Sequence, residues 1–325
     1  MRARIGASAR GRAAKARGPR GDLTSGAPDT DHQGMEVLLP RSLDEALDLA
    51  AASPEAVPVA GGTDVMVELN MDHARPELLM DVSRLAELAR WEREDGHVFL
   101  GAGVTYTQIM RELPEATALV QASRSVGSPQ IRNRGTVGGN LGTASPAGDA
   151  LPVLAALNAE VVLGAAGGRT RSLPWDVFLT GVKRNAREPG ELIIGARWRV
   201  PRGPGSFSKI GTRNAMVISV AGLCLQLDED ERSVRVALGS VAPTVIRATE
   251  AEAVGASALE RAGVWDEPAA TIAPEELEAF AELVASAARP IDDVRGTATY
   301  RRHACRVLAW RALAWALDDR RPEAA

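Results

Sequence analysis

Apolar residues recur along this chain in the two periods that distinguish helices from strands. Ser42-Leu43-Asp44-Glu45 has the form of a capping box and precedes apolar residues at helical spacing, which predicts a helix that ends near Ser53-Pro54. The same spacing predicts five further helices, at residues 105–113, 115–123, 248–254, 273–287 and 298–317.

Shorter apolar runs predict strands. Residues 91–100 alternate around Gly96 as a hairpin, and a second hairpin crosses residues 164–168. The predicted strands are residues 57–60, 78–82, 159–163, 169–173, 191–200, 206–213, 217–227 and 233–240. Strands followed by helices argue for an α+β fold rather than a doubly wound sheet. Arg202-Gly203-Pro204-Gly205 predicts a domain boundary, which gives domains at 35–204 and 205–325.

Residues 1–34 lack this pattern. Residues 1–21 contain seven arginines or lysines, no acid and few apolar residues, so they cannot form a core. They also lack the apolar stretch of a secretory signal. We expect either a disordered basic tail or a misassigned start, with Met35 as the natural first residue.

Composition narrows the possible partners. The 325 residues carry a net charge of −4, which gives no reason to expect nucleic acid. No apolar run approaches the ~18 residues that a membrane-spanning helix needs. Cys224 and Cys305 are too few for an iron–sulfur cluster, which takes about four ligands, and they form no zinc pattern. We therefore expect a cytoplasmic protein with two reduced, buried thiols and no metal of its own.

Three glycine-containing turns carry the candidate chemistry, at residues 61–62, 101–103 and 135–142. Glycine is unfavourable inside a helix, so the third stretch is expected to be irregular. Glycine lets backbone N–H groups converge on an anion, which points to a phosphate or pyrophosphate ligand. None of the three is a Rossmann fingerprint or a P-loop. The chain also lacks a Gly-x-Ser-x-Gly elbow, its histidines are scattered, and no catalytic acid or base is predicted.

These stretches resemble a known family. Ala60-Gly61-Gly62-Thr63-Asp64, Thr136-Val137-Gly138-Gly139-Asn140 and Ala144-Ser145-Pro146-Ala147-Gly148-Asp149 are similar to the FAD-binding medium subunit of molybdenum hydroxylases, the carbon monoxide and xanthine dehydrogenase type. The similarity extends over residues 35 to about 315. It implies a vanillyl-alcohol-oxidase (PCMH) type FAD domain of two subdomains. A C-terminal domain with a three-stranded sheet and helices would follow.

The resemblance implies a set of cofactor-binding residues. They are Pro58, Val59, Ala60, Gly61, Gly62, Thr63, Asp64, Val65, Val126, Thr136, Val137, Gly138, Gly139, Asn140, Asp149, Ile193 and Lys209. In the family, the two glycine stretches hold the FAD pyrophosphate through backbone N–H groups, and the lysine lies near the flavin. The residues alone allow a second interpretation: Asp149 as a helix cap, Val126 and Ile193 as core, and Lys209 as an exposed strand lysine.

The resemblance also implies partners. A large subunit would hold the molybdenum cofactor and a small subunit the 2Fe–2S clusters, in a heterotrimer or a dimer of heterotrimers. FAD would take electrons from the clusters and pass them to NAD, a quinone or oxygen. Many members have an acid shortly after the lysine strand, but Thr212-Arg213-Asn214-Ala215-Met216 contains none. Two alternatives stay open: a standalone flavin oxidoreductase of this fold, and a scaffold subunit without FAD.

Overall fold

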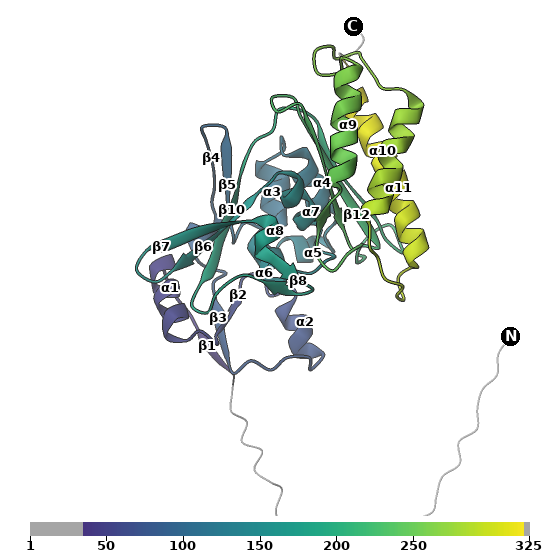
Figure 1. Ribbon diagram of the computed structural model, residues 1–325. Coiled ribbons are helices and arrows are strands. Elements are labelled where there is room, and N and C mark those ends of the chain that lie inside the picture. Colours follow the sequence, from purple (N-terminus) through teal and green to yellow (C-terminus); the bar gives the residue numbers. More distant parts are fainter. Residues whose placement is uncertain (1–34, 322–325) are drawn as a thin grey trace, which may run out of the picture. The chain divides into compact units, whose positions relative to one another are not determined.

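The computed structural model describes residues 35–321. The expectation for residues 1–34 lies outside this part of the chain. Three sheets organise it, and a two-stranded ribbon of β8 (Leu179–Gly181) and β9 (Arg184–Asn185) accompanies them (Figure 1).

The first sheet is parallel and has the order β1-β3-β2. Its strands are β1 (Glu36–Leu38), β2 (Val57–Val59) and β3 (Leu78–Asp81). The predicted helix α1 (Leu43–Ala52) follows β1, and α2 (Val65–Asn70) follows β2. Ser42 Oγ accepts a hydrogen bond from the Glu45 N–H, as a cap does. The Glu45 carboxylate accepts from the Arg41 N–H instead of completing the capping box.

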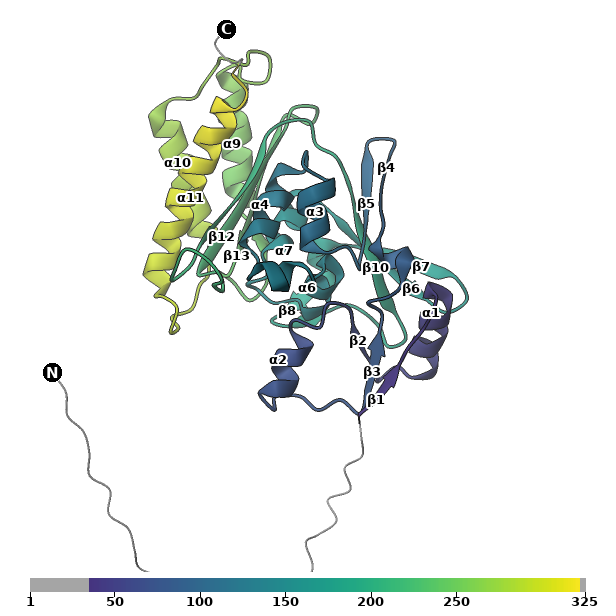
Figure 2. The same ribbon diagram turned by 180° about the vertical axis from the view of Figure 1, so that it is seen from behind.

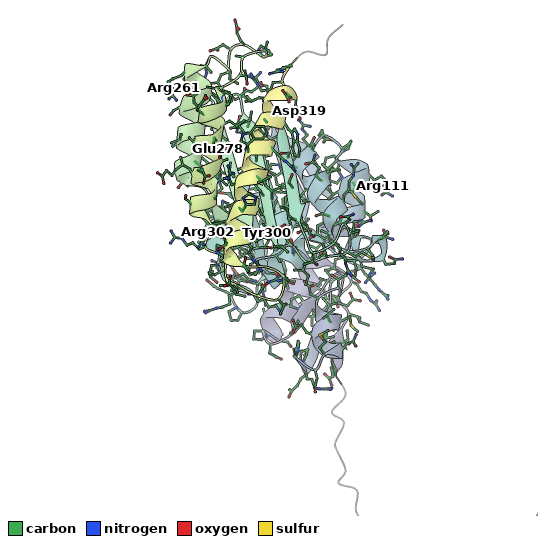
Figure 3. All side chains as sticks on the ribbon, turned by 90° about the vertical axis from the view of Figure 1, so that its right-hand side faces the viewer. Arg111, Arg261, Glu278, Tyr300, Arg302 and Asp319 are labelled. Atoms are coloured by element: carbon green, nitrogen blue, oxygen red, sulfur yellow. The ribbon has the colours of Figure 1, made fainter. Side chains whose placement is uncertain are left out.

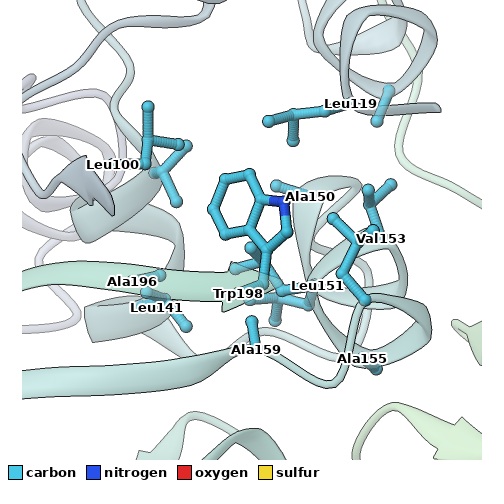
Figure 4. Packing of buried hydrophobic residues seen from close by; sticks show 14 of the residues in the cluster. Leu100, Leu119, Leu141, Ala150, Leu151, Val153, Ala155, Ala159, Ala196 and Trp198 are labelled. Atoms are coloured by element: carbon cyan, nitrogen blue, oxygen red, sulfur yellow. The ribbon is translucent and has the colours of Figure 1, made fainter. Parts of the chain in front are cut away.

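The second sheet is antiparallel, with the order β4-β5-β10-β6-β7. Its strands are β4 (Trp91–Glu94), β5 (His97–Gly101), β6 (Glu160–Ala165), β7 (Arg169–Pro174) and β10 (Leu192–Arg199). Both predicted hairpins are confirmed. Trp198 on β10 is 5% exposed and lies among small and aliphatic side chains such as Leu100, Leu119 and Val153 (Figure 4). These neighbours come from β5 and from helices α4 (Thr117–Ser125) and α7 (Ala150–Ala156).

The third sheet has the order β11-β12-β13-β14 and is covered on both faces. Its strands are β11 (Gly205–Ile210), β12 (Ala221–Asp228), β13 (Ser233–Gly239) and β14 (Ile246–Arg247). Phe207, Cys224 and Ala237 form one cross-strand row and belong to the core around α4 and α7. Leu223 and Leu225 belong to the core on the opposite face. That face carries α9 (Thr249–Arg261), α10 (Pro274–Ala287) and α11 (Ala298–Asp318), as Figures 1 and 2 show. Every residue of β12 is consequently buried.

The outer surface of the C-terminal helices carries charged side chains together with the exposed aromatic rings of Tyr300, Trp310 and Trp315 on α11. Figure 3 shows Tyr300 and Arg302 near the start of α11, Asp319 beyond its end, and Glu278 on the neighbouring α10. Arg306 on α11 forms an ion pair with Glu278. Cys305 lies on the buried side of α11, where burial raises the pKa of its thiol to about 12.

The structure differs from the sequence predictions at several elements. The glycine-rich stretch expected to be irregular forms most of α6 (Val137–Thr143), and the short helix α5 (Pro129–Arg132) precedes it. Strand β12 begins at Ala221 rather than at residue 217, because Val217 folds back against Gly211. Helix α9 continues to Arg261, and β14 was not predicted. Three other elements complete the described chain: η1 (Ala86–Ala89), α3 (Tyr106–Glu112) and α8 (Trp175–Phe178). No helix within residues 35–321 is both long and apolar enough to cross a membrane.

A buried arginine connects α11 to the third sheet. Arg301 is 1% exposed and donates to the backbone oxygens of Val220 (3.1 Å) and Ser240 (2.8 Å). It also pairs with Asp293 at 2.5 Å. Arg295, backbone hydrogen bonding and Arg301 together hold the pKa of Asp293 far below its ordinary value of 3.8.

We expect Asp293→Asn to lower stability at neutral pH and to make acid unfolding less steep. A carboxylate with a depressed pKa stabilises the fold above pH 3.8, and this stabilisation is lost as the pH falls toward its folded pKa. Urea unfolding from neutral to acidic pH measures both effects. Asp266→Asn is the control, since its pair with Arg232 is exposed and worth little. Equal acid profiles for wild type and Asp293→Asn would contradict this prediction.

Candidate cofactor site

A cavity of about 950 Å³ lies where the first two sheets meet β11 and the glycine stretches. This volume is at the upper end of the roughly 300–1,000 Å³ typical of small-molecule sites. Fifteen of the seventeen predicted cofactor residues line it. They are Pro58, Ala60, Gly61, Gly62, Thr63, Asp64, Val65, Val126, Thr136, Gly138, Gly139, Asn140, Asp149, Ile193 and Lys209. The other two, Val59 on β2 and the buried Val137 on α6, are not among its lining residues.

The first glycine stretch connects β2 to α2 and leaves its donors unused. Gly62 has a φ of +74°, which glycine adopts without strain. Among the hydrogen bonds of residues 35–321, none is donated by the N–H groups of residues 61–65. Consecutive free N–H groups on one wall of a cavity make a binding site for an anion.

The second stretch uses its glycines differently. A Cβ on Gly61 would lie 2.1 Å from the Arg134 carbonyl oxygen, and one on Gly138 would lie 2.4 Å from the Ala102 Cβ. Glycine therefore allows two backbone segments to touch, and helix α6 to pack against Ala102. This packing outweighs the cost of glycine in a helix, which explains the wrong prediction of irregular structure.

The N–H groups of α6 are already occupied. Those of Val137, Gly138 and Asn140 donate to the backbone oxygens of Val104, Ala102 and Thr136, respectively. The N–H of Gly139 donates to Thr136 Oγ1 at 2.9 Å. The expected backbone donors of residues 137–140 are thus engaged inside the protein. Only the first stretch presents a row of free N–H groups.

The third glycine turn mainly serves packing. A Cβ on Gly101 would lie 2.3 Å from the Leu88 carbonyl oxygen, and one on Gly103 would lie 3.1 Å from the same atom. Ala102 and Gly103 nevertheless form part of the cavity wall.

A side-chain hydrogen bond connects the first stretch to the end of α6. Thr143 Oγ1 donates to Asp64 Oδ2 at 2.7 Å, between residues 79 positions apart in the chain. Asp64 has no basic side chain within ion-pair distance among the described residues. Thr143 thereby holds the free N–H groups of residues 61–65 in place beside α6.

We expect Thr143→Val to weaken FAD binding about five- to tenfold, because one hydrogen bond is worth about 1 kcal/mol. Flavin fluorescence titration measures the dissociation constant. Thr143→Ser keeps the hydroxyl and Asp64→Asn keeps an acceptor, so both should bind close to wild type. If the serine variant bound as weakly as the valine variant, the hydrogen bond would not be the cause.

A buried ion pair between Lys209 and Asp149 forms part of the cavity wall. Lys209 Nζ lies 2.6 Å from Asp149 Oδ2 and donates to the Ser125 carbonyl oxygen at 3.1 Å. The Lys209 and Asp149 side chains are 10% and 5% exposed. Burial raises the pKa of Asp149, and Lys209 opposes this shift. Lys209 is therefore not an exposed strand lysine, and its charge is compensated by Asp149.

Asp149 does not cap α7 with its side chain. It occupies the position before Ala150, but its carboxylate accepts no hydrogen bond from the helix N-terminus. Its Oδ2 instead accepts from Ser125 Oγ at 2.8 Å. Asp149 is therefore the N-cap residue of α7 by position, without the side-chain hydrogen bond of a cap.

Two apolar residues and a tyrosine complete the walls. Val126 and Ile193 line the cavity and also pack against the main core, so neither side chain belongs to the core alone. Tyr106 is 3% exposed, and its ring would lie 3.3 Å from a Cβ on Gly135. Burial, then the charges of Asp149 and Asp64, raise the pKa of its phenol, which is neutral at physiological pH. Nothing in the sequence distinguished Tyr106 from a core tyrosine.

Two buried oxygens on these walls have no protein partner. Asn140 Oδ1 and Asp149 Oδ1 are both buried and accept no hydrogen bond among the described residues. Buried acceptors without a donor are unfavourable, so each is suited to a donor from a bound molecule. Free N–H groups at one wall and free acceptors at another fit a ligand that has both a diphosphate and hydrogen-bond donors.

Sequence reasoning missed two lining segments. Lys183 and Asn185 come from the β8–β9 ribbon, where Lys183 pairs with Glu68 and Asn185 donates to the Gly142 carbonyl oxygen. Met216, Val217 and Ile218 come from the loop after β11. Sequence analysis had noted that residues 212–216 lack the acid that many members of the family have there. It did not predict that this loop lines the cavity.

Comparison with known proteins decides the family. Residues 33–202, about half of the chain, match the family described as the FAD binding domain in molybdopterin dehydrogenase. The chain belongs to this family. FAD is accordingly its cofactor, and it is a subunit of an oxidoreductase.

Relatives in this family extend the match beyond the FAD domain. The chain is 30% identical to the carbon monoxide dehydrogenase medium chain of Hydrogenophaga pseudoflava over 296 residues, 87% of this chain and 97% of the relative. It is 35% identical to the nicotinate dehydrogenase FAD-subunit of Eubacterium barkeri over 210 residues, 62% and 71% of the two chains. A solved carbon monoxide dehydrogenase from Hydrogenophaga pseudoflava superposes with a TM-score of 0.77 at 26% identity and covers 89% of this chain and 98% of that one. The α+β fold of the family therefore extends over the described chain.

Proposed function

We propose that this chain is the FAD-carrying electron-transfer subunit of a molybdenum-containing hydroxylase complex. A small partner subunit with 2Fe–2S clusters supplies the electrons, and a large partner subunit with the molybdenum cofactor oxidises the substrate. The chain passes the electrons to an external acceptor. The observation that carries this proposal is the presence, on one cavity, of a row of free N–H groups at residues 61–65 and of the buried acceptors Asn140 and Asp149. Similarity to a carbon monoxide dehydrogenase medium chain supports the partners.

The residues present fit FAD without rearranging the buried charges. The N–H groups of residues 61–65 bind the diphosphate, and the free oxygens of Asn140 and Asp149 accept from cofactor donors. Val126 and Ile193 provide apolar surface for an aromatic ring system. When bound, FAD supplies the ability to exchange electrons singly or in pairs. The Lys209–Asp149 pair keeps the adjacent wall close to neutral.

We also propose the finer architecture. Residues 35–204 form the PCMH-type FAD domain, with the parallel and the antiparallel sheet as its two subdomains. Residues 205–325 form the C-terminal domain. The complex is a cytoplasmic heterotrimer or a dimer of heterotrimers.

Purification tests the function and its two rivals. The full chain, expressed with its neighbouring reading frames, should be yellow and should co-purify with iron- and molybdenum-containing subunits. A colourless chain would support the scaffold alternative. If the chain alone oxidised a substrate without partners, the standalone enzyme would replace our proposal.

A further inference from the structure

The segment that carries the free N–H groups, residues 61–77, is held by few contacts, and we call it the strap. It contains the first glycine stretch and helix α2, and none of its residues is buried. The apolar side chains of Met66, Val67 and Met71 are 50%, 48% and 63% exposed. Burial of an apolar face, which holds most helices in place, therefore contributes little to the position of α2.

Two side-chain links join the strap to the rest of the described chain. One is the hydrogen bond from Thr143 to Asp64. The other is an ion pair, in which Lys183 Nζ lies 2.5 Å from Glu68 Oε1. His73 Nδ1 lies 3.6 Å from the Glu68 carboxylate, but His73 belongs to the strap itself and adds no further link. If the ion pair opens, the side-chain link at Asp64 is the one that remains.

Lys183 is fixed from the opposite side. It occupies the turn of the β8–β9 ribbon, where its φ is +53°. Its backbone N–H donates to the Ala144 carbonyl oxygen at 3.1 Å, and the Asn185 side chain donates to the Gly142 carbonyl oxygen at 2.9 Å. Both acceptors belong to the end of α6, so the ribbon is attached to that helix. Figures 1 and 2 both show β8 beside α2, the helix that the lysine reaches.

The ion pair connects two segments that line the cofactor cavity. Glu68 and Lys183 are both lining residues, as are residues 61–65, whose N–H groups are free. Glu68 comes three residues after Val65, so the pair fixes the helical turn that directly continues the row of N–H groups. Lys183 has its carboxylate partner on the strap, and its charge therefore acts on the position of the strap.

We propose that Glu68 and Lys183 form a clasp that retains FAD. The inference rests on the proposed function, which places the FAD diphosphate at residues 61–65. While the pair is closed, the strap holds its N–H groups at the diphosphate. When the pair opens, the strap keeps only its side-chain link at Asp64, and FAD leaves. Glu68 and Lys183 are positioning residues, since they act through the backbone of the strap and take no part in electron transfer.

FAD exchange tests the clasp. The full chain, carrying FAD and its co-expressed subunits, is mixed with an excess of radiolabelled FAD, and incorporation of the label gives the rate at which bound FAD leaves. We expect Lys183→Met and Glu68→Gln each to raise this rate about three- to fivefold, because a partly exposed ion pair is lost. High salt should raise the wild-type rate and change the rates of the variants less, because salt screens the pair. The double variant Glu68→Lys/Lys183→Glu should return the rate to near that of wild type.

The Glu68→Gln variant separates the clasp from direct attraction between Lys183 and the cofactor. If Lys183 bound the diphosphate itself, loss of Glu68 would free the lysine and FAD would leave more slowly, which would overturn the inference. Unchanged rates in both single variants would do the same. Arg197→Met is the matched control, because it breaks a pair with Glu160 whose side chains are 55% and 40% exposed and do not line the cavity. It should exchange FAD like wild type, whereas a wild-type chain purified without FAD would contradict the proposed function itself.

Discussion

Gly61→Ala is expected to abolish FAD binding at micromolar cofactor while leaving the protein folded. The new Cβ would lie 2.1 Å from the Arg134 carbonyl oxygen and 2.6 Å from its carbon, so two backbone segments would have to separate. The free N–H groups of residues 61–65 would then shift relative to the buried acceptors of Asn140 and Asp149, which line the same cavity. We expect a loss of affinity of at least about a hundredfold, equivalent to about 2.7 kcal/mol. Flavin fluorescence titration of the apoprotein measures it.

Gly142→Ala is the matched control for this experiment. Gly142 also lines the cavity, but a Cβ there would lie 3.7 Å from the nearest side chain, which is ordinary contact. Alanine also favours the helix by about 1 kcal/mol. This variant should bind FAD within about threefold of wild type. Unchanged binding by Gly61→Ala would mean that the contact between the two glycine stretches does not position the cofactor.

The fold was predictable wherever the local sequence pattern is enough to determine a helix or a strand. The hairpin at residues 91–100 and helix α10 follow from alternation and from helical spacing. Helix α6 was not predictable, because its three glycines disfavour a helix when considered alone. Only the contact of Gly138 with Ala102 on another segment explains why the helix forms. Short elements such as β8, β9 and β14 likewise depend on tertiary contacts.

The candidate site was predictable to the level of its segments but not of its contacts. Resemblance identified both glycine stretches, Asp149 and Lys209, and the structure groups them around one cavity. The pairing of Lys209 with Asp149 joins residues 60 positions apart, and no local pattern indicates it. The same holds for Thr143 with Asp64. Sequence reasoning also could not foresee that the N–H groups of α6 are engaged while those of residues 61–65 are free.

Among side-chain changes at the site, we expect Lys209→Met to be the most destabilising, because it breaks the buried ion pair between Lys209 and Asp149. Removal of Lys209 leaves the Asp149 carboxylate, whose side chain is 5% exposed, with only Ser125 as a partner. Breaking a buried pair in this way typically costs about 3 to 5 kcal/mol. Chemical denaturation of the apoprotein measures this loss separately from any effect of FAD.

The pH dependence of Lys209→Met identifies the cause of that loss. Without the lysine, only the hydrogen bond from Ser125 opposes the effect of burial, so the pKa of Asp149 rises further above the ordinary value of 3.8. A carboxylate with a raised pKa binds its proton more tightly in the folded state, so the variant should lose stability as the pH rises above 3.8. Adding Asp149→Asn should remove this slope and recover most of the stability at neutral pH, because no buried charge is left unpaired. If Lys209→Met were as stable as wild type at neutral pH, the charge pairing of Lys209 with Asp149 would be contradicted. If the dependence of stability on pH remained in the double variant, it would have to arise elsewhere in the protein.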